Sequence, residues 1–186
     1  MEREHFSFLE LLKVALISLA IVLPIRYFLM QPFFVKGASM EPNYEDGQYL
    51  IIDEISWRFR EPKRGEVTVF KYSKDTSQYY IKRIIGLPNE TIKIENNQVS
   101  VLMVGTSSFE KLEEKYLDST QITEGDVTVK LADDEYFVMG DNRLASYDSR
   151  RFGPVQRSYF VGRAWIRAWP FGAAVLLPSV QYSLNK

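Results

Sequence analysis

The stretch Glu66-Val-Thr-Val-Phe-Lys-Tyr72 alternates its side chains with a period of two. Val67 and Val69 fall on one side of an extended chain, while Thr68 and Phe70 fall on the other. A run of this kind, rich in β-branched and aromatic residues, is typical of a β-strand. The stretch therefore predicts a sheet for this part of the chain.

Similar runs lie on both sides of this strand, at residues 49–52, 79–87, 90–95, 98–104, 127–131, 136–139 and 161–166. Pro88-Asn89 and Asn96-Asn97 separate three of them, and asparagine tolerates the positive φ of tight turns. Many short strands with turns between them predict a mainly β fold, built as a barrel or as folded sheets. We expect one β-rich domain over residues 33–186.

Two segments of this domain fit the strand pattern less well. Residues 105–126 are polar and charged, which indicates an insertion, with a short helix expected around residues 109–116. The sequence assigns this insertion no role. Further on, the aromatic stretch 165–171 precedes apolar residues 173–177, which are too few to cross a membrane. Two interpretations are open there: a closing strand with a loose tail, or an aromatic edge resting on a bilayer surface.

The chain before residue 33 is dominated by apolar side chains. Residues 14–25 carry no charge, and apolar neighbours extend this run to residues 6–30. A bilayer-spanning helix needs about 20 such residues. We therefore expect a membrane anchor over residues 1–32, with one transmembrane helix that Pro32 ends. Flanking charges lie on both sides of the run, and we expect the N-terminus in the cytoplasm and the domain outside.

Two other interpretations of the N-terminal run remain open. A cleaved signal peptide has an apolar core of this length, but it needs small residues at the minus-one and minus-three positions. The small residues here are Gly37-Ala38-Ser39, and a cut after Ala38 would place Lys36 at minus three. That favours a retained anchor. The other interpretation is a buried helix of a soluble domain.

Composition removes several classes of function. The 186 residues carry a net charge of −1, which gives no electrostatic case for nucleic acid as a partner. The chain has no cysteine, so disulfides, a cysteine nucleophile and thiolate metal sites are excluded. The single histidine is His5, before the apolar run, so a Ser-His-Asp triad or a histidine-built zinc site does not fit the domain. We expect no metal and no cofactor.

The stretch Gly37-Ala-Ser-Met-Glu-Pro42 is the first candidate for chemistry, because small and turn-forming residues let the backbone approach another group closely. Taken alone, Ser39 is more simply an exposed loop serine. The second candidate is the strand at residues 79–88, where Lys82 and Arg83 would point to opposite faces among apolar groups.

Lys82 has two interpretations. An edge strand would let both cations reach solvent. Alternatively, burial lowers a lysine pKa by up to about 3–5 units and leaves a neutral amine that acts as a general base. Because the domain has no histidine, a serine–lysine pair is the economical way to activate Ser39.

Residues 140–153 form the third candidate and are dense in hydrogen-bonding groups. A solvated loop is one interpretation. A calcium site on Asp141 and Asp148 is another, although interleaved arginines oppose a cation and the spacing does not match an EF-hand. The functional interpretation is a scaffold, in which Asp148 pairs with Arg150 and the hydroxyl of Ser146 orients the lysine amine.

Together, these stretches resemble type I signal peptidases, the membrane-bound proteases that remove signal peptides from exported proteins. The matching motifs follow an N-terminal anchor in order: Gly37-Ala-Ser-Met-Glu-Pro42, Lys82-Arg-Ile-Ile-Gly-Leu-Pro88, and Gly140-Asp-Asn-Arg143 with Ser146 and Asp148-Ser-Arg150. The resemblance covers most of the chain and is greatest to the compact bacterial members with a single anchor.

The resemblance implies that Ser39 is the nucleophile and Lys82 the general base, with support from Ser146, Asp148 and Arg150. It implies preprotein substrates with small residues, often alanine, at minus three and minus one. It also implies a bilayer as a partner, and a catalytic domain on the outer side of the bacterial plasma membrane.

One position departs from the family pattern. Some members carry a serine where this chain has Gly37, and the hydroxyl of that serine contributes to the oxyanion hole. Here the hole would rest on the Ser39 N–H, with help from the backbone at Gly37. Since losing one oxyanion donor costs about 3–4 kcal/mol, we expect either a replacement or a slower enzyme.

Two functions of other classes compete with the peptidase. The first is an inactive single-pass homologue that acts as a peptide-binding envelope adaptor, although the presence of both Ser39 and Lys82 counts against it. The second is a self-cleaving repressor with a serine–lysine pair. Such repressors are soluble and carry a DNA-binding domain, for which residues 1–32 are not patterned.

Overall fold

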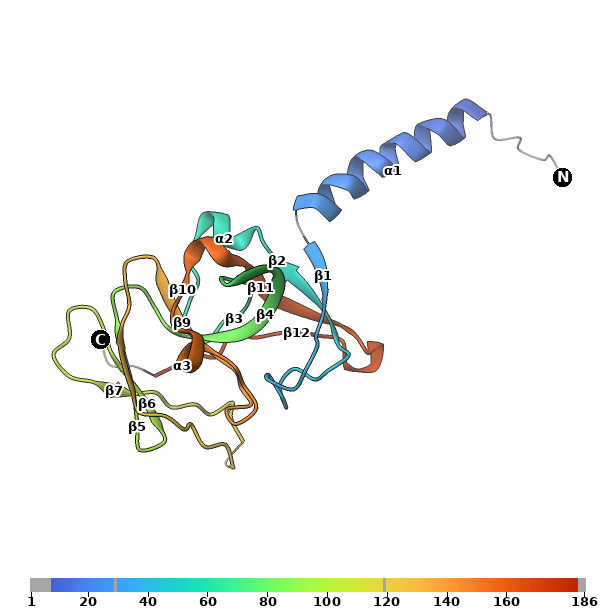
Figure 1. The fold of residues 1–186 in the computed structure, drawn as a ribbon. Coiled ribbons are helices and arrows are strands. Elements are labelled where there is room, and N and C mark those ends of the chain that lie inside the picture. Colours follow the sequence, from blue (N-terminus) through green and yellow to red (C-terminus); the bar gives the residue numbers. More distant parts are fainter. Residues whose placement is uncertain (1–7, 29, 119, 184–186) are drawn as a thin grey trace.

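The computed structural model describes residues 8–28, 30–118 and 120–183. Residues 1–7 and 29 of the expected anchor, including His5, and residues 119 and 184–186 of the expected domain lie outside the described residues. A β-rich domain carries a helix that projects away from it (Figure 1). The mainly β prediction is confirmed.

The helices are short except for the first one: α1 (Phe8–Phe28), α2 (Ser56–Phe59), α3 (Ser149–Phe152), and the 3-10 turns η1 (Arg157–Tyr159) and η2 (Phe171–Ala173). The strands are β1 (Met30–Phe34), β2 (Tyr49–Asp53), β3 (Val67–Tyr72), β4 (Asp75–Gly86), β5 (Thr91–Glu95), β6 (Gln98–Leu102), β7 (Glu110–Lys111), β8 (Val127–Lys130), β9 (Glu135–Met139), β10 (Val155–Gln156), β11 (Phe160–Trp169) and β12 (Val175–Leu176).

Two sheets make up the domain. The larger has eight strands in the order β1-β2-β11-β3-β4-β9-β10, with β12 added alongside β11. The smaller has four strands in the order β7-β6-β5-β8. The predicted hairpin between β5 and β6 is confirmed, and both turn asparagines have positive φ, 49° at Asn96 and 61° at Asn97.

Strand β3 lies inside the larger sheet and is covered on both faces. Val67 and Val69 belong to one buried apolar cluster, and Phe70 belongs to another. A third cluster, which includes Ile85 and Ile92, joins β4 to the smaller sheet. The centre of β4 is therefore surrounded by core, which sets the environment of Lys82.

The insertion at residues 105–126 differs from the prediction. The short helix expected at residues 109–116 is wrong, because Glu110 and Lys111 form β7 and pair with β6. The next residue, Leu112, is buried in the core under the smaller sheet. In an extended conformation, the backbone of residues 110–111 pairs with the edge of β6 while the Leu112 side chain enters the core.

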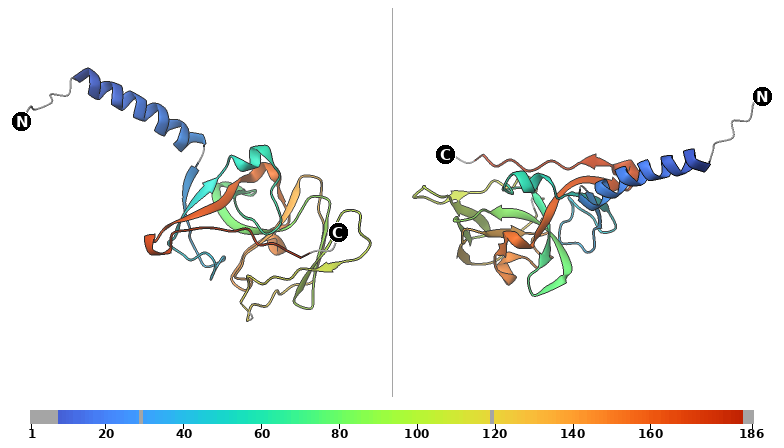
Figure 2. Two further views of the ribbon diagram at one scale, coloured as in Figure 1. Left: turned by 180° about the vertical axis from the view of Figure 1, so that it is seen from behind. Right: turned by 90° about the horizontal axis from the view of Figure 1, so that it is seen from above.

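The C-terminal segment also differs from one of the two interpretations, since it is not a loose tail. Strand β12 turns back and pairs with β11. The chain then crosses the domain toward the smaller sheet, where Tyr182 packs against the core (Figure 2). A hydrogen bond of 3.3 Å from the Val180 N–H to the Gly65 carbonyl fixes its path.

Helix α1 continues through Pro24 and ends at Phe28, so the prediction that Pro32 ends it is wrong. Pro32 instead lies in β1, opposite Ile51, and β1 is at the edge of the larger sheet, where proline is tolerated.

The expected transmembrane helix finds no support in the part of the chain that the structure describes. None of the helices there has the combined length and hydropathy of a bilayer span.

Gly162 tests how tightly the strands of the larger sheet are packed. An added Cβ would lie 2.7 Å from the Asp53 carbonyl oxygen, a backbone atom that cannot rotate away. We expect Gly162→Ala to lower the free energy of unfolding by about 1–3 kcal/mol, as overpacking does. Gly172→Ala is the matched control, because a Cβ there meets nothing within 4 Å. Equal unfolding free energies for the two variants, measured by urea titration of the full chain in detergent, would contradict the predicted clash.

Candidate active site

Ser39 lies in the loop that joins β1 to β2. The loop turns tightly, because the Glu41 N–H donates to the Ala38 carbonyl at 3.2 Å and the Tyr44 N–H donates to the Met40 carbonyl at 3.0 Å. Met40 is fully buried in the core, while Ser39 is half-buried. Because the buried Met40 side chain anchors the turn, the backbone of Ser39 is fixed while its side chain stays partly exposed.

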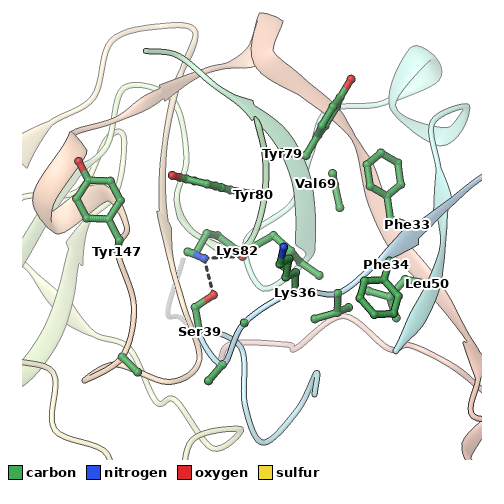
Figure 3. Close-up of a pocket in the computed structure, with 15 residues that line it drawn as sticks. Phe33, Phe34, Lys36, Ser39, Leu50, Val69, Tyr79, Tyr80, Lys82 and Tyr147 are labelled. Carbon is green, nitrogen blue, oxygen red and sulfur yellow. Dashed lines mark hydrogen bonds between the residues drawn. The ribbon is translucent and has the colours of Figure 1, made fainter. Parts of the chain in front are cut away.

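Lys82 comes from β4, between β3 and β9, and its side chain is only 4% exposed. The expectation that both cations of this strand reach solvent is therefore wrong, since Arg83 is also buried. The Lys82 amine donates to the Ser39 hydroxyl at 2.7 Å and to the Ile81 carbonyl at 2.9 Å (Figure 3). The structure thus brings together the two residues that the sequence paired.

The environment of Lys82 favours its neutral form. Burial lowers the pKa of Lys82 to about 8, against the attraction of the Asp148 and Asp141 carboxylates, which act in the opposite direction. The Tyr80 ring centre lies 5.7 Å from the Lys82 nitrogen. An amine with this pKa is neutral in a large fraction of molecules in mildly alkaline solution, and a neutral amine accepts protons.

The loop that begins at Gly140 packs directly on the Ser39 backbone. The Asn142 N–H donates to the Ser39 carbonyl at 3.1 Å. An added Cβ on Gly140 would lie 2.4 Å from the Ser39 carbonyl oxygen and 2.3 Å from the Ser146 hydroxyl. Only glycine permits this approach. Ser146 is buried beside it. Its hydroxyl makes no hydrogen bond to Lys82, and its proximity to the Asp148 carboxylate helps to lower the pKa of Asp148.

Asp148 holds the two ends of this loop together. Its carboxylate accepts from the Gly140 N–H at 3.1 Å and from the Arg150 side chain at 2.9 Å, and it also caps α3. Burial raises the pKa of Asp148, but the hydrogen bond and charge of Arg150 outweigh burial and hold that pKa below its ordinary value. Asp148 is therefore an ionised, fully partnered brace.

The motif residues Arg83, Asp141 and Arg143 make ion pairs that the sequence did not predict. Arg83 makes a two-bond ion pair with Asp141, at 2.8 and 2.5 Å. Arg143 reaches Glu114 and the hydroxyl of Tyr116, both from the insertion at residues 105–126. The sequence did show several arginines in residues 140–153, which indicates ion pairs. It did not show the partners of Arg83 and Arg143, because those lie far away in the chain.

A pocket of about 330 Å³ opens beside Ser39 and Lys82. Its apolar wall comes from four different strands, with Phe33, Leu50, Val69 and Ile81 among the lining residues. Phe33, Phe34 and Leu50 stand on one side of the hydroxyl–amine pair, and Tyr147 stands on the other (Figure 3). The arrangement places a hydroxyl, a buried amine and an apolar space side by side.

Comparison with known proteins agrees with this site. The family described as signal peptidase, peptidase S26, matches residues 8–169. A Synechocystis protein named "Probable signal peptidase I-2" is 36% identical, over 92% of this chain and 78% of its own. A signal peptidase I of Leptolyngbya laminosa is 33% identical over 87% of this chain and 80% of its own. Another, from Bacillus amyloliquefaciens, is 33% identical over 91% of this chain and 90% of its own. The chain therefore belongs to the signal peptidase family, peptidase S26, and is an enzyme of the signal peptidase I kind.

Proposed function

We propose that this enzyme cleaves signal peptides from exported preproteins with a dyad formed by Ser39 and Lys82. The observation that carries the proposal is the 2.7 Å hydrogen bond between the Lys82 amine and the Ser39 hydroxyl, made by a lysine that is almost fully buried. A serine with a neutral amine at this distance is an activated nucleophile.

The reaction follows from the positions of these two groups. The Lys82 amine takes the hydroxyl proton as the Ser39 oxygen attacks the scissile carbonyl carbon. The resulting ammonium returns that proton to the departing amine, which leaves as the N-terminus of the mature protein. Water then attacks the acyl-enzyme, with Lys82 again as the base, and the signal peptide leaves with a free carboxylate.

The oxyanion is stabilised, in our proposal, mainly by the Ser39 N–H. The Gly37 N–H is occupied, because it donates to the Asp46 carboxylate at 2.6 Å. Gly37 has a φ of 90°, a conformation that L side chains rarely adopt. This backbone conformation explains why glycine suits the position and gives the loop its direction toward Ser39.

The remaining site residues act through the dyad. Asp148 and Arg150 keep the loop from Gly140 pressed on the Ser39 backbone. Ser146 is assigned to orient the ammonium form of Lys82, which has one more proton to donate than the neutral amine. The support for this role is that its hydroxyl is buried next to Gly140 and lies near the Asp148 carboxylate, which also acts on Lys82.

The substrate is proposed to bind as an added strand along residues 79–82 of β4. Strand β3 pairs with this part of β4, while β9 pairs only further along, from Arg83. One edge of residues 79–82 is therefore without a strand partner in the described chain, and an extended peptide adds to such an edge. Small residues of the Ala-X-Ala type at minus one and minus three are proposed to enter the pocket beside Ser39, whose lining includes Phe33, Leu50 and Val69.

The enzyme is proposed to work at the outer face of the plasma membrane. Apolar side chains of α1 are exposed, among them Phe8, Leu9 and Ile17. On the domain, Trp169 contacts Phe171 at a ring distance of 4.8 Å, and both are exposed, at 47% and 78%. Aromatic rings of this kind are suited to the interface between water and lipid. These two surfaces would hold the site where signal peptides emerge.

The dyad makes cleavage depend on pH and on both residues. We expect Ser39→Ala and Lys82→Ala to reduce cleavage of an Ala-X-Ala preprotein in detergent to background. For the wild type, kcat should rise with pH and reach half its maximum near pH 8, because Lys82 must lose its proton and burial lowers its pKa to about 8.

One control substrate and two alternative outcomes separate the claims in this assay. A preprotein with phenylalanine at minus one should resist cleavage if the pocket selects small residues. Cleavage that survives Lys82→Ala would remove the dyad and leave the peptidase standing. A folded wild type that cleaves no preprotein would favour the inactive peptide-binding adaptor.

Burial of Lys82 also predicts how stability changes with pH. The folded-state pKa of about 8 is below the ordinary 10.5, so between these values the unfolded chain binds more protons. We expect the free energy of unfolding to rise by about 2 kcal/mol from pH 7 to pH 9.5. Lys82→Met should remove this rise and be the more stable form at pH 7. An equal rise in both proteins would show that another group titrates.

Membrane contact by the aromatic edge can be measured through tryptophan fluorescence. In vesicles of phosphatidylethanolamine and phosphatidylglycerol with brominated chains, we expect the full-length protein to be quenched, because bromine quenches indoles that reach the lipid. Trp169→Phe should remove most of this quenching. Trp57→Phe is the control, since Trp57 is buried in the domain. Equal quenching of wild type and Trp169→Phe would place the aromatic edge away from the bilayer.

A further inference from the structure

The insertion at residues 105–126 places the side chain of Tyr116 behind Ser39 and Lys82, next to Arg83 and Arg143. Its hydroxyl uses all of its hydrogen-bonding capacity. It donates to Glu114 at 2.7 Å, and it accepts from Arg143 at 2.9 Å and from Tyr182 at 3.2 Å. Three segments that are distant in the sequence therefore meet at a single oxygen atom.

The ring of Tyr116 contacts a different arginine. The Arg83 guanidinium carbon lies 4.2 Å from the ring centre, which is cation–π contact. The edges of the same guanidinium are occupied by Asp141, through two hydrogen bonds, and by the Gly65 carbonyl at 2.9 Å. Arg83 is thus enclosed on its face and its edges, directly after Lys82 in β4.

The segment of residues 178–183, which we call the strap, reaches this cluster at two points. The Val180 N–H donates to the same Gly65 carbonyl that receives Arg83, at 3.3 Å. Gly65 has a φ of 87°, and a Cβ there would lie 2.2 Å from the Val180 carbonyl oxygen, so glycine is required for the strap to pass. Tyr182 is the second point, through its hydrogen bond to Tyr116.

A short series of contacts joins the cluster to the nucleophile. The Asn43 side chain donates to Asp141 at 2.9 Å and to the Tyr116 carbonyl at 3.1 Å. Asn43 lies in the same turn as Ser39, and the residue after Asp141 donates its N–H to the Ser39 carbonyl. Displacement of Tyr116 would therefore loosen both segments that fix the Ser39 backbone.

We propose that Tyr116 and Tyr182 are positioning residues for the reaction, and that the strap and the insertion together form a brace behind the Ser39–Lys82 dyad. This inference rests on the proposed function, and it gives the insertion a role in that function. Neither tyrosine touches the reacting atoms. They act through Arg83, Asp141 and the loop that begins at Gly140.

The brace also affects how readily Lys82 loses its proton. The charged groups that act on Lys82 are the carboxylates of Asp148 and Asp141, both of which favour its protonated form, and the Tyr80 ring also faces its amine. Arg83 neutralises Asp141 from the far side. If the ring of Tyr116 is lost, Arg83 is held less firmly, Asp141 acts more strongly on Lys82, and the amine becomes harder to deprotonate.

The test compares Tyr116→Leu, Tyr116→Phe and Tyr182→Leu with the matched control Tyr136→Leu, all in the full-length chain in detergent. Tyr136 is equally a buried, hydrogen-bonded tyrosine, but it lies in another core cluster and bonds to Glu61. For Tyr116→Leu we expect kcat to fall about tenfold with little change in KM, a smaller effect than the roughly hundredfold cost of a 1 Å misplacement. The midpoint of the kcat–pH profile should move to higher pH.

The other variants separate the parts of the brace. Tyr116→Phe keeps the ring over Arg83, so it should restore the midpoint while part of the kcat loss remains. Tyr182→Leu should also lower kcat, as Tyr116→Leu does. A midpoint that is unchanged in Tyr116→Leu, or that moves equally in Tyr136→Leu, would overturn the proposal.

A second readout does not need activity. The Lys82 side chain can be followed by NMR with 13C-labelled lysine, using Lys82→Met to assign its signal. We expect its pKa to be higher in Tyr116→Leu than in wild type and unchanged in Tyr136→Leu. If the wild type cleaves no preprotein but this shift is seen, the proposed function fails and the brace stands. If cleavage occurs and the shift is absent, the brace fails and the function stands.

Discussion

The burial of Lys82 is the constraint on which the rest of the site depends. A lysine in water is protonated at neutral pH and cannot take a proton from serine. Here apolar clusters on both faces of β4 remove the amine from water, and its remaining hydrogen bonds go to Ser39 and to the Ile81 carbonyl. The fold therefore gives up some stability at neutral pH and, in our proposal, gains a general base, which is a common exchange at catalytic sites.

Carboxylates close to a buried amine would normally cancel this effect. Two of them, Asp141 and Asp148, act on Lys82, and each is already paired with its own arginine, Arg83 and Arg150. These arginines make the carboxylates useful as braces while limiting their effect as counter-ions. Arg143 repeats the pattern with Glu114 one layer further out, where it supports the carbonyl of Gly140. The carboxylates that act on Lys82 are thus paired with arginines, whereas Lys82 itself forms no ion pair among the described residues.

The fold class and the pairing of Ser39 with Lys82 were accessible from the sequence for different reasons. Strands such as β3 and the β5–β6 hairpin are encoded locally, by alternation and by turn asparagines. Ser39 and Lys82 were paired because few other reactive side chains exist in the domain and because their motifs resemble a known family. The roles of Ser146, Asp148 and Arg150 remain predictions that the geometry supports to different degrees.

The parts that could not be predicted depend on distant contacts. The insertion was expected to form a helix because its residues are polar and charged, but Leu112 belongs to a core that the local sequence does not reveal. Pro32 was expected to end a helix, and its edge-strand position depends on β2. In the same way, the strap looked like a tail because its partners, Gly65 and Tyr116, lie far back in the chain.

These separations have a consequence for how the enzyme comes into being. Lys82 and Ser39 are 43 residues apart, Asn43 and Asp141 are 98 apart, and Tyr116 and Tyr182 are 66 apart. Contacts between residues so far apart in the sequence form late in folding, because the entropic cost of closing the long loops must be met first. Until they close, Lys82 stays hydrated and protonated, and the serine has no base. If Ser39 and Lys82 act as we propose, a nascent or partly unfolded chain cannot cleave a peptide, and proteolytic activity begins only when the whole domain has folded.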